Sequence, residues 1–374
     1  MEHTAVIAAY ARTPFHFAGK GDLARVRPDD LAALVVKGLL SRTDIDAKDI
    51  EDLILGCAFP EGEQGFNLAR LVVLRAELPQ TIGGVTVNRF CGSSMQAIHQ
   101  AAGNIKSGAG KVFICAGVES MSRIPMGGFN PLPHPEMAKA TQAYISMGET
   151  AENLAKKYSI SRDAQEKFAV LSQTKAAQAR SQGRLSDEII PVGNVSEDGC
   201  IRAETTAEGL AGLKPAFDQF GTVTAGTSSP LTDGASATLV CSEEYARAHG
   251  LKILARIKSM AVSGCAPEIM GIGPVDATQK ALKRAGVSLK DIDVIELNEA
   301  FAAQSLSVLQ ELGADPTKVN IDGGAIALGH PLGASGARIT GKAASLLQRE
   351  GKSLGLATMC IGGGQGIATV LEAA

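Results

Sequence analysis

The sequence predicts an α/β protein made of two copies of one unit, with a block of different character inserted into the first copy. Three observations indicate this. Strand and helix patterns alternate along residues 5–116 and again along 253–374, as in proteins with parallel or mixed sheets. An eleven-residue stretch recurs in both parts, which is the mark of internal duplication. Residues 117–230 break the alternation with prolines, glycines and methionines.

The composition indicates a soluble globular protein of two or more domains. Of the 374 residues, 45% are hydrophobic and none is Trp, so Ala, Val, Ile and Leu must form the core. Such a core suits buried sheets that helices cover. The net charge of −3 and the pI of about 6.1 argue against a nucleic-acid or anionic-membrane partner.

The cysteines and the N-terminal residues bear on the cellular compartment. The seven cysteines stand far apart and form no Cys-x-x-Cys pair, so we expect neither a disulfide framework nor a metal site. Residues 1–10 show no basic region and no apolar run of signal-peptide length. No window is apolar enough for a transmembrane segment. We therefore expect a cytoplasmic protein.

The first copy shows its elements in regular order. We predict strands over residues 5–10, 50–55, 85–88 and 111–116. We predict helices over residues 29–40, 65–76 and 93–107, and the first and third of these have apolar residues on one face.

The middle of the chain has a different pattern. Residues 150–182 predict two helices broken near 159–162, with Ser161 as the cap of the second, and residues 183–230 predict short strands and loops. Strands over residues 237–241 and near 253–260 follow. The predicted division is a first half of residues 1–116 plus 231–252, an inserted loop domain of 117–230 and a second half of 253–374.

The internal repeat fixes this architecture. D-I-E-D-L-I-L-G-C-A-F (49–59) aligns without gaps to D-I-D-V-I-E-L-N-E-A-F (291–301), with five identical positions. Each copy continues with a Val-Asn pair, a turn of small residues, a helix and a strand that ends in Cys-x-Gly. This alignment makes Cys115 the counterpart of Cys360, as a packed cysteine. It also predicts that the turn with Cys91 faces the corresponding turn of the second copy.

Cys91 stands in V-T-V-N-R-F-C-G-S-S-M-Q-A-I, where a strand pattern changes into a helical one. We therefore place Cys91 at a helix N-terminus, where free N–H groups and the helix dipole favour negative charge. Such a thiol should have a lowered pKa and be a better nucleophile. The alternative is a buried cysteine that acts as a small hydrophobic residue. This stretch alone does not separate the two.

The second turn, G-G-A-I-A-L-G-H-P-L-G-A-S-G (323–336), holds His330 before a helix. The dipole disfavours the imidazolium, so we expect a neutral imidazole that accepts a proton rather than a packed histidine. Cys360 precedes I-G-G-G-Q-G, whose glycines let the backbone approach a ligand and offer N–H groups to an oxyanion. Asn298 replaces Gly56 of the first copy and is suited to orient a water. Two cysteines and a histidine in such turns indicate acyl transfer.

Four motifs together resemble those of the thiolase family, over essentially the whole chain: N-R-F-C-G-S-S-M-Q-A, N-E-A-F-A-A-Q, G-G-A-I-A-L-G-H-P-L-G-A-S-G-A-R and C-I-G-G-G-Q-G. The resemblance implies a duplicated five-layered α-β-α-β-α architecture with an inserted loop domain. It implies Cys91 as the acylated nucleophile, His330 as its activator and Cys360 as the general acid and base. Asn298 with its water and His330 would form one oxyanion hole. The N–H groups of Cys91 and Gly362 would form the other.

Within the family, the details are most similar to the 3-ketoacyl-CoA thiolases of bacterial fatty-acid β-oxidation. This similarity implies 3-oxoacyl-CoA, acetyl-CoA and CoA as substrates and products, with no tightly bound cofactor. The inserted loop domain would bind CoA through Arg202, Met147 and Ser229. A homodimer or homotetramer is expected, and some members of the degradative group associate with a hydratase/dehydrogenase subunit.

Three rival interpretations stay open at this point. The nearest is a biosynthetic or degradative acetoacetyl-CoA thiolase (acetyl-CoA C-acetyltransferase), which uses the same residues on a shorter substrate. A ketoacyl synthase is disfavoured by the second cysteine. A non-catalytic lipid-binding or scaffold protein of the same fold is disfavoured by the intact Cys91, His330 and Cys360.

Overall fold

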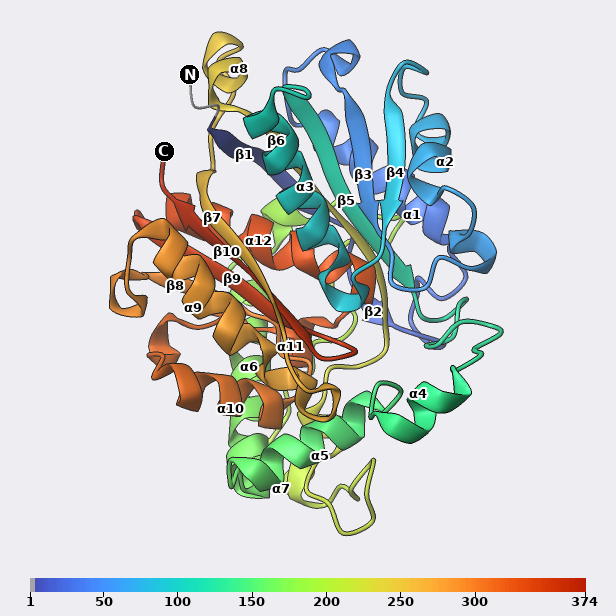
Figure 1. Cartoon of the computed structure of the whole chain (residues 1–374), viewed down its shortest axis with the longest axis vertical. Coiled ribbons are helices and arrows are strands. Elements are labelled where there is room, and N and C mark those ends of the chain that lie inside the picture. The colour runs from blue at the N-terminus through green and yellow to red at the C-terminus, as the bar shows by residue number, and fades with distance from the viewer. Residues whose placement is uncertain (1–3) are drawn as a thin grey trace.

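The computed structural model describes residues 4–374 and contains one ten-stranded mixed sheet. Figure 1 shows residues 4–116 of the first half in blue to teal and the second half in orange to red. The strands are β1 (Ala5–Arg12), β2 (His16–Phe17), β3 (Asp52–Gly56), β4 (Gly83–Val87), β5 (Val112–Ser120), β6 (Thr232–Ser242), β7 (Ala255–Gly264), β8 (Val294–Leu297), β9 (Leu354–Ile361) and β10 (Gln365–Glu372).

The two halves of the sheet have the same strand order. The order β4-β3-β5-β6-β1 of the first half is mirrored by β8-β9-β10-β7 of the second. The isolated bridge from Ile295 to Val319 supplies the counterpart of β4. The halves join where β1 and β7 pair antiparallel, through Val6 with Arg256 and Ile7 with Ala255. The duplication predicted from the sequence therefore appears as a pseudo-twofold about the centre of the sheet.

Helices form three layers, one on the outer face of each half of the sheet and one between the two halves. The helices of the two halves are α1 (Pro28–Leu40), α2 (Leu68–Arg75), α3 (Ser93–Ser107), α8 (Glu243–Ala248), α9 (Gly273–Ala285), α10 (Ala302–Leu312), α11 (Ala325–Leu328) and α12 (Leu332–Arg349). One core contains residues of α1 and α2 together with Leu53 and Leu55 of β3. A second contains residues of α3 and α12 together with Ile54 of β3 and Val294 of β8.

The third core contains residues of α9 and α10 with Ile295 and Leu297 of β8. Successive side chains of β3, and likewise of β8, thus enter different cores, as the two-residue period of a strand requires. The helices α3 and α12 form the shared middle layer of a five-layered α-β-α-β-α arrangement, as the resemblance implied.

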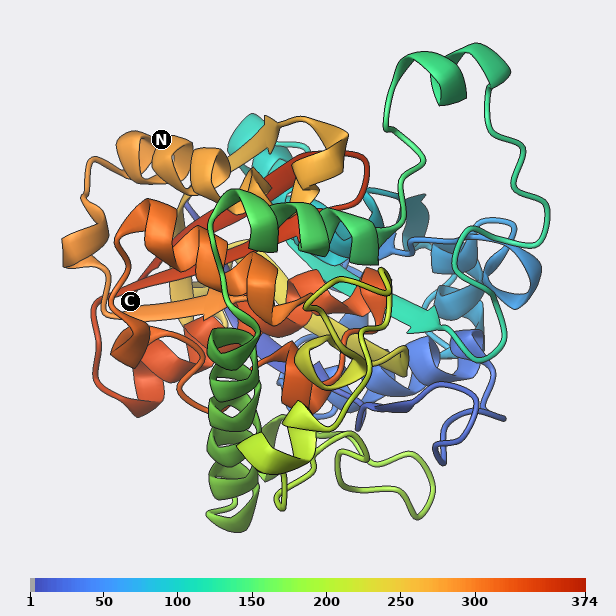
Figure 2. The same ribbon diagram turned by 90° about the horizontal axis from the view of Figure 1, so that it is seen from below.

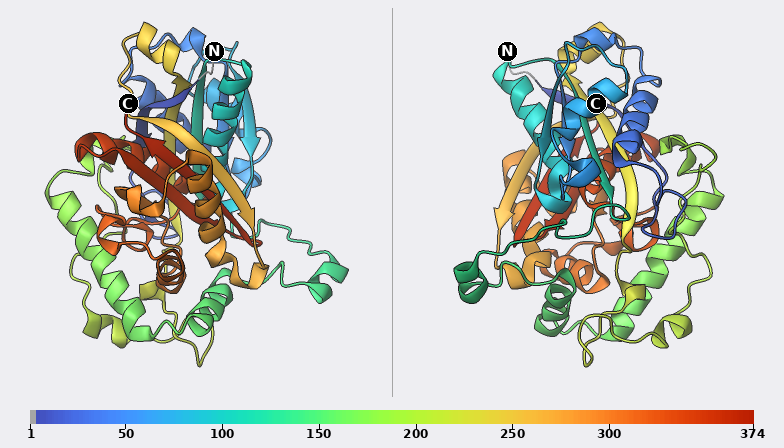
Figure 3. Two further views of the ribbon diagram at one scale, coloured as in Figure 1. Left: turned by 60° about the vertical axis from the view of Figure 1, so that its left-hand side comes forward. Right: turned by 90° about the vertical axis from the view of Figure 1, so that its right-hand side faces the viewer.

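The middle block is mostly helix and loop. It contains α4 (Pro135–Ala140), α5 (Met147–Lys157), α6 (Arg162–Ser181) and α7 (Ala207–Ala211). Ser161 caps α6 by accepting from Ala164 N, as predicted. Residues 183–230 form short helices and isolated bridges, so the prediction of short strands there is wrong. The loop that carries α4 stands away from the body (Figures 2 and 3).

Two details of the sequence prediction need correction. Strand β5 continues to Ser120, past the predicted strand end at residue 116, because β6 pairs with it as far as Asp233. The second concerns Cys115. It pairs with Ile54, whereas Glu296, the repeat equivalent of Ile54, pairs with Ala357.

Cys115 therefore corresponds to Ala357, and its predicted equivalence with Cys360 is wrong. The counterpart of Cys360 is Val118, three residues further along β5. Among residues 4–374, no helix has the length and apolar character needed to cross a membrane.

Candidate active site

Cys91 lies in a single 3-10 turn (Phe90–Gly92) between the end of β4 and the start of α3. The turn is tight, because Phe90 takes a positive φ of 42° that side chains other than glycine rarely adopt. Gly92 has no space for a side chain, since a methyl group there would come within 2.7 Å of Ile361 on β9. The structure therefore places Cys91 at a helix start, as the sequence predicts, and directly against the end of β9.

The surroundings of the Cys91 thiol differ from the sequence prediction. Cys91 is partly buried, and the loss of hydration at its thiol raises the pKa to about 12, while the N–H of Gly362 acts in the opposite direction. The expectation that the helix N-terminus lowers the pKa of Cys91 is therefore wrong. The loss of hydration outweighs the dipole, because a thiolate loses more by burial than a thiol. At rest Cys91 is a protonated thiol and needs a base.

His330 is held on both sides of its ring. Its Nδ1 lies 2.5 Å from Ser335 Oγ, and Ser335 Oγ lies 3.0 Å from Pro331 O. A carbonyl oxygen only accepts, so the Ser335 hydroxyl donates to Pro331 and accepts from His330 Nδ1–H. This assignment leaves Nε2 without a proton, and Asn298 Nδ2 donates to it at 3.3 Å.

The charge state of His330 agrees with a role as a base. Burial lowers its pKa to about 3, and the positive charge of Arg338 adds to the effect. The ring is therefore neutral at physiological pH. Asn298 Oδ1 is buried and has no hydrogen-bond partner among the described residues. A buried acceptor of this kind is suited to hold a water.

Cys360 lies near the end of β9 and is 1% exposed. It belongs to a small apolar cluster with Met147 and Phe301. Burial raises the pKa of the Cys360 thiol, and a negative charge on Cys91 would raise it further. Gly362 lies two residues after Cys360 and close to Met147, because a methyl group on Gly362 would lie 3.4 Å from Met147 Sδ.

The buried carboxylate of Glu119 links the first and second halves of the chain close to these residues. Glu119, at the end of β5, accepts hydrogen bonds from Ala58 N at 2.9 Å, Gln64 Nε2 at 2.7 Å and Phe59 N at 3.3 Å. It also accepts from Gly333 N at 2.9 Å, in the first turn of α12. A carboxylate is favourable at a helix N-terminus. Glu119 thereby holds α12, which begins two residues after His330, against the first half.

The starts of α3 and α12 also touch directly. A methyl group on Gly336 would lie 2.3 Å from Met95 N, and Ala337 N donates to Ser94 Oγ at 2.8 Å. These contacts fix the helix that follows Cys91 against the helix that follows His330.

Sequence reasoning missed Ser335 and Glu119. Ser335 stands inside the G-H-P-L-G-A-S-G motif, where it was treated only as part of a helix start. Glu119 lies in a strand with no polar pattern, so nothing local indicated its contacts.

The three residues predicted to contact CoA have different neighbours in the structure. Met147 adjoins Gly362, as described above. Ser229 N donates to Ala300 O at 2.9 Å, two residues from Asn298. The guanidinium of Arg202 is 5.6 Å from the ring centre of Phe17, and the backbone N–H of Arg202 donates to Gln173 Oε1. Within residues 4–374, no group of His, Cys, Asp or Glu is arranged to hold a metal ion.

Comparison with known proteins gives consistent matches over the whole chain. Residues 5–244 match the family model of the thiolase N-terminal domain, and residues 251–373 match that of the thiolase C-terminal domain. The chain is 48% identical to the 3-ketoacyl-CoA thiolase of Bacillus subtilis, with 98% of this chain and 99% of that protein covered. It is 53% identical to the 3-ketoacyl-CoA thiolase of Shewanella baltica, with the same coverage.

Two solved structures superpose closely on the chain. The acetyl-CoA acetyltransferase of Bacillus anthracis does so with a TM-score of 0.92 at 40% identity. The human mitochondrial 3-ketoacyl-CoA thiolase does so with a TM-score of 0.92 at 39% identity. Each superposition covers 100% of this chain and 99% of the other.

Proposed function

Because this chain belongs to the thiolase family, we propose that it cleaves 3-oxoacyl-CoA with CoA to acetyl-CoA and an acyl-CoA shorter by two carbons, in fatty-acid β-oxidation. The observation that carries the proposal is that the turn with Cys91 packs against the end of β9, which carries Cys360, while the helix after Cys91 is hydrogen-bonded to the helix after His330. The 3-ketoacyl-CoA thiolase names of relatives about 50% identical over the full chain support this substrate class.

The first half of the reaction forms an acyl-enzyme. His330 Nε2 takes the proton from Cys91, and the sulfur attacks the 3-keto carbon of the substrate. The bond between C2 and C3 then breaks, and its electron pair leaves on acetyl-CoA as an enolate. Cys360 gives its proton to that enolate and becomes a thiolate.

The second half returns the enzyme to its starting state. The Cys360 thiolate takes the proton of an incoming CoA thiol, and the CoA sulfur attacks the acyl group on Cys91. The bond between Cys91 and the acyl carbon breaks, and His330 gives its proton back to Cys91. Both cysteines end as thiols, so atoms and charge balance.

Two sets of donors stabilise the negative charge on oxygen. Asn298 with a water and His330 would face the thioester oxygen of the leaving enolate. The N–H groups of Cys91 and Gly362 would face the oxygen of the intermediate formed at Cys91. Since the high pKa of Cys91 makes its resting thiolate scarce, proton transfer should occur only when substrate occupies these donors.

CoA would bind along the middle block, which the sequence assigns to residues 117–230. Met147 and Ser229 are next to catalytic turns and would contact the pantetheine arm. Arg202 would also contact CoA. No tightly bound cofactor enters the mechanism.

A homodimer or homotetramer is the expected assembly, in the cytoplasm. Strand β4 forms one edge of the sheet, and Phe66 beside it is 95% exposed. An open edge next to apolar side chains favours pairing with a second copy. A hydratase/dehydrogenase subunit is a further expected partner. Light scattering on wild type and Phe66→Asp tests the assembly, since the variant should have the lower mass if this edge forms the dimer.

A second candidate is the acetoacetyl-CoA reaction of an acetyl-CoA C-acetyltransferase. The observation in its favour is the TM-score of 0.92 to the acetyl-CoA acetyltransferase of Bacillus anthracis. The two functions differ in substrate length alone. Rates of thiolysis on C4 and on C8–C16 3-oxoacyl-CoA separate them: activity confined to C4 would favour this second candidate.

The mechanism is tested by trapping the acyl-enzyme. Incubation with acetyl-CoA should add one acetyl group on Cys91, detected by mass spectrometry of peptides. Cys91→Ala should abolish labelling and thiolysis, whereas the control variant Cys115→Ala, at a buried cysteine of β5, should retain both. An unmodified Cys91, or thiolysis by Cys91→Ala, contradicts the mechanism.

A further inference from the structure

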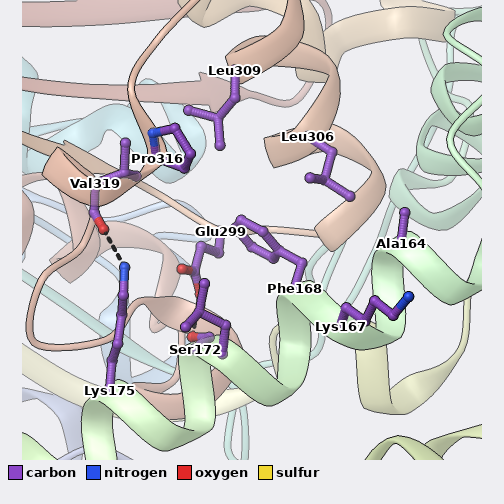
Figure 4. A pocket seen from close by; sticks show the side chains of 11 residues that line it. Ala164, Lys167, Phe168, Ser172, Lys175, Glu299, Leu306, Leu309, Pro316 and Val319 are labelled. Carbon is purple, nitrogen blue, oxygen red and sulfur yellow. Dashed lines mark hydrogen bonds between the residues drawn. The ribbon is translucent and has the colours of Figure 1, made fainter.

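A pocket lies between α6 of the middle block and α10 (Figure 4). Its volume is about 260 Å³, slightly below the range of about 300–1,000 Å³ typical of small-molecule sites. The apolar part of its walls includes Phe168, Leu171, Leu306, Leu309, Pro316 and Val319, and its polar lining residues are Lys167, Ser172, Lys175 and Glu299. The space suits a flexible hydrocarbon chain.

Lys175 is the half-buried amine of this pocket. Its Nζ donates to Val319 O at 2.8 Å, which is the only hydrogen bond that the described residues give it. The other lysine of the pocket, Lys167, is different: its side chain is 69% exposed and forms an ion pair with Asp163 at 2.8 Å. Figure 4 shows Lys175 beside Val319 and Lys167 at the opposite end of the α6 segment.

The surroundings of Lys175 favour a reactive amine. Burial lowers its pKa, although the negative charge of Glu299 acts in the opposite direction. A lowered pKa increases the fraction of neutral amine, which is the nucleophilic form. The bond to Val319 O uses one N–H of Nζ, so the lone pair that deprotonation exposes remains free.

We propose that Lys175 is a site of self-acylation by medium-chain acyl-CoA, with the acyl chain held against the apolar walls of this pocket. Nζ attacks the thioester carbon, a C–N bond forms, and the C–S bond of the thioester breaks. The CoA sulfur leaves as a thiolate and takes the proton that the amine loses. The products are an amide on Lys175 and free CoA, and no further reagent is needed.

The position of the pocket gives such a modification a route to the catalytic turns. The carboxylate of Glu299 lies at the pocket and accepts from Ser172 Oγ at 2.6 Å, Asn320 Nδ2 at 2.8 Å and Ile326 N at 3.1 Å. Glu299 follows Asn298 directly in the chain. An acyl group on Lys175 would therefore lie beside the segment that positions Asn298. The proposal rests on the proposed function only because that function brings acyl-CoA to the enzyme.

The test compares two lysines and two chain lengths in the intact enzyme. Wild type is incubated with octanoyl-CoA or with acetyl-CoA, and acylation of Lys175 and Lys167 is followed by peptide mass spectrometry. The octanoyl-to-acetyl rate ratio at Lys175 should exceed that at Lys167 by about tenfold, the effect of burying about two methylene groups. Cys91→Ala should acylate Lys175 as fast as wild type does, so a failure of thiolysis and a failure of this proposal are distinguishable.

Two leucines of equal exposure provide matched variants. Leu171 on α6 is 46% exposed and lines the pocket, whereas Leu74 on α2 is 45% exposed and lies elsewhere. Leu171→Ala should slow octanoylation of Lys175 by about fourfold, the effect of about one buried methylene group, and leave its acetylation unchanged. Leu74→Ala should change neither rate. Equal rate ratios at Lys175 and Lys167, or no effect of Leu171→Ala, overturn the proposal.

Discussion

Replacing Ser335 by alanine removes the hydroxyl that accepts from His330 Nδ1–H. In the proposed mechanism the ring becomes an imidazolium when Nε2 takes the proton of Cys91. The contact between Nδ1 and Ser335 Oγ, at 2.5 Å in a buried site, is then a hydrogen bond from a charged donor. Such bonds contribute about 1.5–3 kcal/mol. Since the charge exists only as the reaction proceeds, the loss should fall on kcat, by about 10- to 100-fold, with little change in KM.

The assay is steady-state thiolysis of a 3-oxoacyl-CoA, followed by loss of substrate. Ser335→Thr keeps a hydroxyl at this position and should restore most of the activity. Ser345→Ala is the matched control, because Ser345 lies on the same helix in a partly exposed position away from His330. A kcat for Ser335→Ala within twofold of wild type would refute the role assigned to this hydrogen bond. An equal fall for Ser345→Ala would attribute the effect to α12 as a whole.

Three further predictions concern stability and ionisation. Glu119→Gln places an amide NH₂ against two of the buried N–H donors that the carboxylate now accepts from. Chemical denaturation should therefore show a loss of about 2–6 kcal/mol in the free energy of unfolding, against about 0–1 kcal/mol for Glu63→Gln, whose partly exposed carboxylate pairs with Arg123. Equal denaturation midpoints for the two variants would disprove the anchoring role of Glu119. Alkylation of resting Cys91 by iodoacetamide should accelerate up to at least pH 10, because the pKa of Cys91 is raised to about 12, and a plateau below pH 8 would contradict this burial effect. Hydrogen bonds from Arg256 lower the pKa of Glu243 from 4.5 to about 2. The stabilisation that the Glu243 carboxylate gives the fold is therefore complete above pH 4.5 and disappears as the pH falls toward 2. The difference in unfolding midpoint between wild type and Glu243→Gln should therefore shrink over that range, and a difference independent of pH would show that the ion pair does not stabilise the fold.

The sequence by itself determined the architecture and the catalytic turns. Strand and helix periods located most elements, because the period of apolar residues follows directly from backbone geometry. The repeat of residues 49–59 in 291–301 showed that the chain is duplicated. The turns around Cys91, His330 and Cys360 could also be found, because their glycines and prolines restrict the local backbone.

Only the tertiary structure decided the register between the copies. The shared Cys-x-Gly motif suggested that Cys115 and Cys360 are equivalent. The hydrogen-bonded pairing of the strands instead makes Val118 the repeat equivalent of Cys360. Register depends on contacts between strands distant in sequence, so matching letters within one strand cannot fix it.

The ionisation of the site was likewise decided by tertiary structure. A helix start is a local feature and correctly located Cys91, but the pKa of its thiol depends on how much water reaches the sulfur. That depends on β9, Gly362 and the middle block, all distant in the sequence. The contacts of Glu119 and Ser335 have the same origin, because they join the ends of strands and helices that only the folded sheet brings together. The sequence thus determined which residues stand in the turns, and packing decided which of them are charged, which are neutral and what holds them in place.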